Sequence, residues 1–135
     1  MITAVDTSVL LDVFGADATF GPRSSDGLRD ALAGGRLVAC DPVWAEVASF
    51  FPSPGAARRA MERLGVEFDP LTEGAALSAG SAWSRYRASG GTRRRVVADF
   101  LIGAHALALA DRLLTRDRGF YRSYFRRLRI ADPTR

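Results

Sequence analysis

The 135-residue sequence predicts an α/β fold: a central parallel sheet of four to five strands, with helices on both faces. Short apolar runs alternate along the chain with segments of helical hydrophobic spacing, a pattern typical of parallel strands joined by crossover helices. A composition that is 47% hydrophobic and 25% charged is that of an ordinary globular protein. With no visible repeat or linker, we expect one domain over residues 1–135.

Five short apolar runs are the expected strands. In chain order they are Ile2–Val5, Leu37–Cys40, Val66–Phe68, Leu113–Thr115 and Leu128–Ala131. Each is bounded by polar, charged or glycine residues, which interrupt regular structure. The runs are nearly free of alternating polar positions, as expected for strands that are buried on both faces.

Helix signals fill the intervals between these runs. We expect helices over residues 9–14, 26–33, 41–50, 54–64, 72–86 and 93–110, a loop over 15–22, and a turn with a short helix within 117–127. Asp41, Ser53 and Thr72 are the expected N-caps of three of these helices, and Pro follows both Asp41 and Ser53 at the first helical position. Gly65 is the expected C-terminal stop of the 54–64 helix.

The basic residues are all arginine, and they are unevenly distributed. Residues 1–84 contain 6 Arg and 11 acidic residues, whereas residues 85–135 contain 13 Arg and 4 acidic residues, so the net charge of +4 divides into −5 and +9. Guanidinium groups bind phosphates in a forked geometry, and a basic half suits a polyanionic partner. The alternative interpretation is a solvated arginine-rich face.

The cysteine count and the length of the longest apolar stretch indicate which kinds of site and which cellular location to expect. Cys40 is the only cysteine, which excludes an internal disulfide or a cysteine-built zinc site, and we expect a buried, inert thiol. The longest mostly apolar stretch, Val96–Ala110, is too short to span a bilayer. The N-terminus lacks the layout of a signal peptide. We therefore expect a cytoplasmic protein with no membrane partner.

Four acidic residues are predicted to meet at one edge of the sheet. Asp6 and Asp117 follow the first and fourth expected strands, at their carboxyl ends. Glu46 lies about one turn into the helix after the second strand, and Asp99 lies near the start of the helix before the fourth. Helices in such a sheet run opposite to the strands, so all four side chains belong to the edge where open parallel sheets bind ligands.

Gathered carboxylates need a counter-charge, and oxygen ligands suit Mg²⁺ or Mn²⁺. The four acids are therefore the candidate metal-binding and catalytic residues for one ion or two, with a phosphodiester as the expected substrate. Thr7, Ser8 and Thr115 are expected to orient them by hydrogen bonds.

The remaining acids have other expected roles. We expect Asp12 to make a solvated or structural contact, Asp41 to cap a helix, and Asp111 to lie at the far end of its helix. Asp69 competes with the four, because it follows the third strand, but that strand is expected at the sheet edge. His105 is expected in the core or at an interface, facing away from the acids.

Several segments resemble PIN-domain ribonucleases, and specifically VapC-type toxins of toxin–antitoxin pairs. They are VDTSVLLDVF at 5–14, VWAEVASFF at 43–51, VADFLIGAHALALADRLLTRDRGFYRSYF at 97–125 and LRIADP at 128–133. Residues 52–92 match only in pattern. The family's acidic positions fall on Asp6, Glu46, Asp99 and Asp117. The resemblance implies a PIN-like domain, Mg²⁺- or Mn²⁺-dependent RNA cleavage, a homodimer, and inhibition by a VapB-type antitoxin.

The arginines nearest these acids are the candidate RNA contacts. Arg93, Arg94 and Arg95 lead into the helix that carries Asp99, where phosphate contact and simple solvation are equally plausible. Arg116 and Arg118 flank Asp117 and are expected either to contact the RNA backbone or to pair with acids.

The sequence also leaves two other functions open. A non-catalytic PIN-like module would bind RNA or protein without needing divalent ions, and a PIN-type nuclease could act on structured DNA. The complete acid set argues against the first, and the small size of the chain makes the second less favoured.

Overall fold

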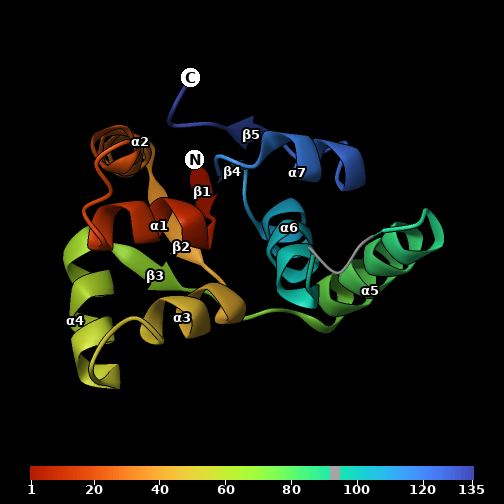
Figure 1. The fold of residues 1–135 in the computed structure, drawn as a ribbon, viewed down its shortest axis with the longest axis horizontal. Coiled ribbons are helices and arrows are strands. Elements are labelled where there is room, and N and C mark those ends of the chain that lie inside the picture. Colours follow the sequence, from red (N-terminus) through yellow and green to blue (C-terminus); the bar gives the residue numbers. More distant parts are fainter. Residues whose placement is uncertain (92–94) are drawn as a thin grey trace.

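A computed structural model describes residues 1–91 and 95–135 (Figure 1). One five-stranded sheet has the order β3-β2-β1-β4-β5, and every neighbouring pair is parallel. The strands are β1 (Ile2–Val5), β2 (Arg36–Ala39), β3 (Val66–Phe68), β4 (Arg112–Leu114) and β5 (Ile130–Ala131). The predicted α/β class with a parallel sheet is confirmed, and the third strand lies at the sheet edge as expected.

Seven helices connect these strands within the described residues. They are α1 (Thr7–Phe14), α2 (Gly21–Gly34), α3 (Asp41–Ala48), α4 (Pro54–Leu64), α5 (Glu73–Ala88), α6 (Val97–Leu109) and α7 (Arg118–Tyr124). In Figure 1, α1 and α2 lie on one side of the strands and α5 and α6 on the other. No helix of the described chain has the length and apolar character to cross a membrane.

The fifth strand is shorter than predicted, Ile130–Ala131 rather than Leu128–Ala131. Two predictions about helix starts were also wrong. The second helix begins at Gly21, five residues before the predicted start, because an Asp17 carboxylate oxygen accepts the backbone N–H groups of Thr19 and Phe20 and turns the chain into α2 early. Asp41 is the first residue of α3 rather than its cap. Its carboxylate instead accepts the N–H of Leu71 at 2.8 Å and so ties α3 to the start of the α5 segment.

The predicted caps at Ser53 and Thr72 are confirmed. Each hydroxyl accepts a backbone N–H of its helix, from Ala56 and Ala75 respectively, both at 3.1 Å. Gly65 ends α4 with φ 77°, a left-handed conformation that a residue with a Cβ adopts only at a cost.

The three central strands, β1, β2 and β4, are mainly buried, as predicted from their continuous apolar character, whereas the edge strands β3 and β5 are partly exposed. Val5, Leu37, Val38 and Leu113 are at most 1% exposed. Against them packs Phe100 of α6, whose ring lies 5.1 to 6.5 Å from four other aromatic rings, those of Trp83, Tyr86, Phe120 and Tyr124. This cluster anchors the start of α6, and with it the neighbouring Asp99.

Candidate metal-binding active site

All four predicted acids line one cavity of about 540 Å³ at the carboxyl edge of the sheet. Asp6 follows β1, and Asp117 follows β4, which pairs directly with β1. The backbone N–H of Asp6 donates to the carbonyl of Leu114 at 3.0 Å, so the ladder extends into the site. Glu46 comes from α3, and Asp99 from the first turn of α6. The fold thus brings the four segments together, as the topology argument predicted.

Thr115 links the two strand-end acids. Its buried hydroxyl donates to Asp6 Oδ2 at 2.7 Å and accepts the backbone N–H of Asp117 at 3.0 Å. Ser8 Oγ lies 3.5 Å from the same Asp6 oxygen, at the limit of a hydrogen bond. The β1 and β4 ends are therefore held in a fixed relation by a side chain that is itself inaccessible to solvent.

Glu46 is held differently from the aspartates. It is exposed, and its Oε1 accepts the hydroxyl of Thr7 at 2.8 Å, which connects α3 to the first turn of α1. Asp99 is half-buried, and its Oδ2 accepts the N–H of Val96 at 3.3 Å, an N-terminal contact of α6. Each acid is thus oriented by a neighbour from its own or an adjacent element.

Three of the acids interact electrostatically. Burial raises the pKa of Asp6 to about 6; the Thr115 hydrogen bond opposes this rise, and the charges of Asp99 and Asp117 add to it. Burial also raises the pKa of Asp99, again with a contribution from Asp117. Tyr121 of α7 is buried, and burial, followed by the charges of all three aspartates, raises the pKa of its phenol well above the ordinary value. Without a cation, the cavity therefore disfavours the ionised form of the Asp6 and Asp99 carboxyl groups.

Arg95 supplies one positive charge inside this cavity. Its guanidinium forms an ion pair with Asp117 and lies 4.2 Å from the centroid of the Phe120 ring. Aromatic support and a carboxylate partner together hold the side chain at the entrance to α6. Arg95 was predicted as an RNA contact; in this structure it is the counter-ion of Asp117. Arg93 and Arg94 lie outside the described residues.

The chemistry of the side chains suits a hard divalent cation, because carboxylates and hydroxyls are the oxygen donors that Mg²⁺ and Mn²⁺ prefer. The raised pKa of Asp6 has the same implication, since a cation would relieve the repulsion that Asp99 and Asp117 impose. Within residues 1–91 and 95–135, no group of three or more acidic, His or Cys side chains is placed to hold an ion. Mg²⁺ usually retains several waters and needs only one or two direct carboxylates, so the open arrangement fits.

Arg116 and Arg118 pair with acids outside the predicted set. Arg116 forms a bidentate pair with Asp12, Nε and Nη2 lying 2.8 and 2.9 Å from the two carboxylate oxygens. Asp12 is buried and also accepts the hydroxyl of Ser24 at 2.8 Å. Arg118 pairs with Asp132 at 3.1 Å. Of the two expected roles, contact with RNA or pairing with acids, the structure therefore shows the second.

The competing acids are engaged elsewhere. Asp69 lies 2.7 Å from Nε2 of the buried His105, which explains both residues as a structural pair between the β3 end and α6. Asp111 accepts the N–H of Ile2, at the opposite edge of the sheet. Cys40 is buried, and burial raises the pKa of its thiol to about 12, as expected for an inert cysteine.

Two features of the site were missed from the sequence. One is the buried phenol of Tyr121, whose pKa is raised by burial and by the charges of three of the acids. The Asp12, Ser24 and Arg116 network joins α1, α2 and the β4 end, and no spacing rule connects residues so far apart in the chain. The sequence predicted a solvated or structural contact for Asp12 and acid pairing as one role of Arg116, but not that the two residues pair with each other.

The raised pKa of Asp6 predicts how stability depends on pH without metal. A carboxyl group with a pKa of about 6 in the folded state and 3.8 otherwise favours folding below about pH 4, and this contribution is lost as the pH rises through 6. We therefore expect Asp6→Asn to raise the free energy of unfolding at neutral pH, in EDTA, by up to about 3 kcal/mol. Thermal unfolding across this pH range measures the effect.

Asp30→Asn is the matched control, because Asp30 is an exposed acid on α2. It should leave the pH profile of the parent unchanged. If the stability of Asp6→Asn depends on pH in the same way as that of the parent, the carboxyl group with the raised pKa is not that of Asp6.

Comparison with known proteins agrees with this architecture. The sequence matches the PIN domain family over residues 3–126. VapBC-1 from nontypeable Haemophilus influenzae is similar in structure, with a TM-score of 0.75 at 21% identity over 100% of both chains. VapBC2 from Rickettsia felis, bound to a promoter DNA fragment, gives 0.75 at 16% identity over 98% of both chains. A toxin–antitoxin complex from Klebsiella pneumoniae gives 0.66 at 18% over 97% of both.

No curated protein matches the sequence significantly. At these identities the solved structures establish the fold alone, whereas the family match covers nearly the whole chain and includes all four acids of the cavity. PIN domains are nucleases. The chain belongs to the PIN-domain family.

Proposed function

We propose that the protein is an Mg²⁺- or Mn²⁺-dependent endoribonuclease that acts as the toxin of a VapBC-type pair. One observation carries the proposal: carboxylates from four separate segments line a single cavity, where burial, with the charges of Asp99 and Asp117, raises the pKa of Asp6. An arrangement that destabilises the metal-free protein is expected where function requires the charge.

Asp6, Glu46, Asp99 and Asp117 are the residues that would hold the ion. When bound, a divalent cation supplies positive charge against a phosphodiester and increases the acidity of water. Thr115 fixes the orientation of Asp6 relative to Asp117, and Thr7 fixes that of Glu46. Carboxylates of the cavity that do not bind the ion can accept the proton of the attacking water.

The proposed partners follow from the relatives. Similar structures include VapBC proteins and a toxin–antitoxin complex, which supports a VapB-type antitoxin as the partner of this chain. RNA as the substrate and a homodimer as the active form rest on the family resemblance, and light scattering of the purified protein tests the second directly.

Removal of the metal is the central test. Purified protein incubated with total RNA should produce discrete fragments in Mg²⁺ or Mn²⁺ and none in EDTA, because the carboxylates alone cannot neutralise the phosphodiester. A parallel panel of single-stranded and structured DNA should remain intact. RNA binding without metal-dependent cleavage would favour a binding module, and cleavage of DNA alone would favour a DNA nuclease.

A further inference from the structure

A second hollow adjoins the acidic cavity. It has a volume of about 400 Å³, and Arg116 and Asp117 line both spaces. Its other walls come from α7 and from the C-terminal segment, with Phe20 from the turn before α2. We call this space the basic groove, and its principal side chains are Phe20, Arg116, Arg118, Arg122 and Arg135.

The basic groove is positively charged on balance. Four arginines and two aspartates line it. Asp117 is paired with Arg95, Asp132 with Arg118, and Arg116 with Asp12. The surplus positive charge among these groups is that of Arg122 and Arg135. Arg122 and Arg135 are exposed, so their guanidinium groups are accessible to a ligand that enters the groove. The electrostatic sign thus changes from negative to positive across the short distance from Asp117 to α7.

Arg116 lines both spaces, and its guanidinium lies over the Phe20 ring, which lines the basic groove. The guanidinium carbon of Arg116 lies 4.0 Å from the centroid of the Phe20 ring. The bidentate pair with the buried Asp12 prevents this guanidinium from turning away. A fixed arginine plane supported by an aromatic ring resembles the surfaces on which unpaired nucleic-acid bases stack.

We propose that the basic groove binds the segment of a single RNA strand that flanks the bond placed in the acidic cavity. Arg122 and Arg135 contact its phosphates, and the Arg116 and Phe20 surface contacts an unstacked base. This inference rests on the proposed nuclease function, which supplies the strand. It also specifies the path of the RNA strand, which runs from the acidic cavity toward α7 and the C-terminal segment.

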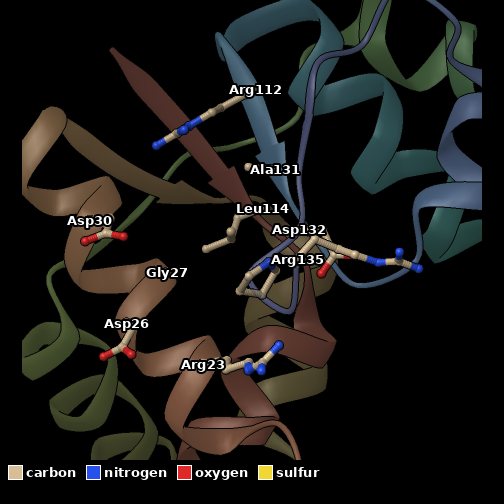
Figure 2. Close-up of a pocket in the computed structure, with 10 residues that line it drawn as sticks. Arg23, Asp26, Gly27, Asp30, Arg112, Leu114, Ala131, Asp132 and Arg135 are labelled. Atoms are coloured by element: carbon tan, nitrogen blue, oxygen red, sulfur yellow. The ribbon is translucent and has the colours of Figure 1, made fainter.

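The next cavity along this side marks where the basic character ends. Figure 2 shows it with Asp26 and Asp30 of α2 on one side, and it shares only Asp132 and Arg135 with the basic groove. Its lining contains three arginines and three aspartates, which balance. A polyanion gains little there, so the contacts proposed above are confined to the basic groove.

Binding in the absence of divalent metal tests the inference independently of cleavage. The probe is a short fluorescein-labelled single-stranded RNA of mixed sequence, and the protein carries Asp99→Asn, with EDTA present. Addition of Arg122→Ser and Arg135→Ser should weaken binding at low salt by about tenfold for each arginine. The slope of log affinity against log salt should become shallower by about 0.7 for each lost phosphate contact.

Phe20→Leu separates stacking from charge. It keeps an apolar side chain beneath Arg116 and should weaken binding about tenfold with no change in the salt slope, because stacking releases no counterions. Arg59→Ser is the control, since Arg59 is an exposed arginine on α4, far from α7 in Figure 1. Arg122→Lys should retain the salt slope, because the charge remains.

Two results would overturn the inference. One is a double arginine variant whose affinity and salt slope equal those of Arg59→Ser, which would mean that the groove serves another ligand, such as an acidic protein segment. The other is an Asp99→Asn protein that binds no RNA at all. A protein that binds through the groove but never cleaves would instead contradict only the catalytic proposal.

Discussion

Asp99→Asn is expected to slow metal-dependent RNA cleavage by more than about 100-fold, because even outer partners of metal ligands typically contribute about 10- to 100-fold. Asparagine has the same shape and keeps a carbonyl oxygen that can accept the N–H of Val96, so α6 should begin at the same residue. What is lost is one negative charge in the cavity that Asp6 and Asp117 share with it. Initial rates on a defined RNA, with saturating Mg²⁺, measure the effect.

The comparison requires proof that the fold survives. Circular dichroism and thermal unfolding of Asp99→Asn should match the parent or show slight stabilisation, because burial and Asp117 raise the pKa of this carboxyl group. Asp30→Asn removes an exposed acid on α2 and should cleave at the parental rate. If Asp99→Asn cuts RNA as fast as Asp30→Asn, the assignment of Asp99 to the catalytic group fails.

Asp12→Ala is expected to be the most destabilising change among the acids, at about 3 kcal/mol, because it breaks an ion pair and leaves the other charge uncompensated. The Asp12 side chain is 6% exposed and that of Arg116 27%, so partial solvation of the arginine places the cost at the low end of the range for buried pairs. The buried Ser24 hydroxyl loses its acceptor as well. For a chain of this length we expect the melting temperature to fall by about 10 °C.

The matched control for this change is Asp26→Ala. Asp26 pairs with Arg29 on the exposed face of α2, where the side chains are 68% and 74% exposed, so its loss should cost less than about 1 kcal/mol. Asp12→Asn keeps an oxygen for Ser24 and should lie between the two. Equal unfolding midpoints in urea for Asp12→Ala and Asp26→Ala would show that the network contributes nothing to stability.

Strands were easier to predict than helix ends. The β1 and β3 bounds were predicted correctly, because continuous apolar runs flanked by polar residues admit few alternatives. The start of α2 was missed because Asp17 directs the turn through its side chain, in a segment that otherwise resembles a loop. Asp41 has the sequence features of a cap, and the choice of Leu71 as its hydrogen-bond donor depends on a segment thirty residues away.

The convergence of the acids was predictable for a general reason. The carboxyl ends of parallel strands share one edge with the N-termini of helices that run opposite to the strands, whether they follow a strand or precede one. Positions in chain order were therefore sufficient to place Asp6, Glu46, Asp99 and Asp117 at one cavity. Their roles as metal ligands and catalytic groups stay predictions. Which acid each arginine pairs with was not predictable. In the predicted fold, several acids lay close enough to pair with Arg95, Arg116 or Arg118.

The amino-acid sequence by itself determined the α/β class, the strands and the sheet edge that holds the acids, because these depend on hydrophobic periodicity and on chain direction, both of which are local. Only the tertiary structure decided that Arg95 neutralises Asp117, that Arg116 belongs to Asp12, and that a basic groove adjoins the acids. Those outcomes depend on distances between side chains from distant segments. Ion pairing and burial both vary steeply with such distances, and no spacing along the chain specifies them.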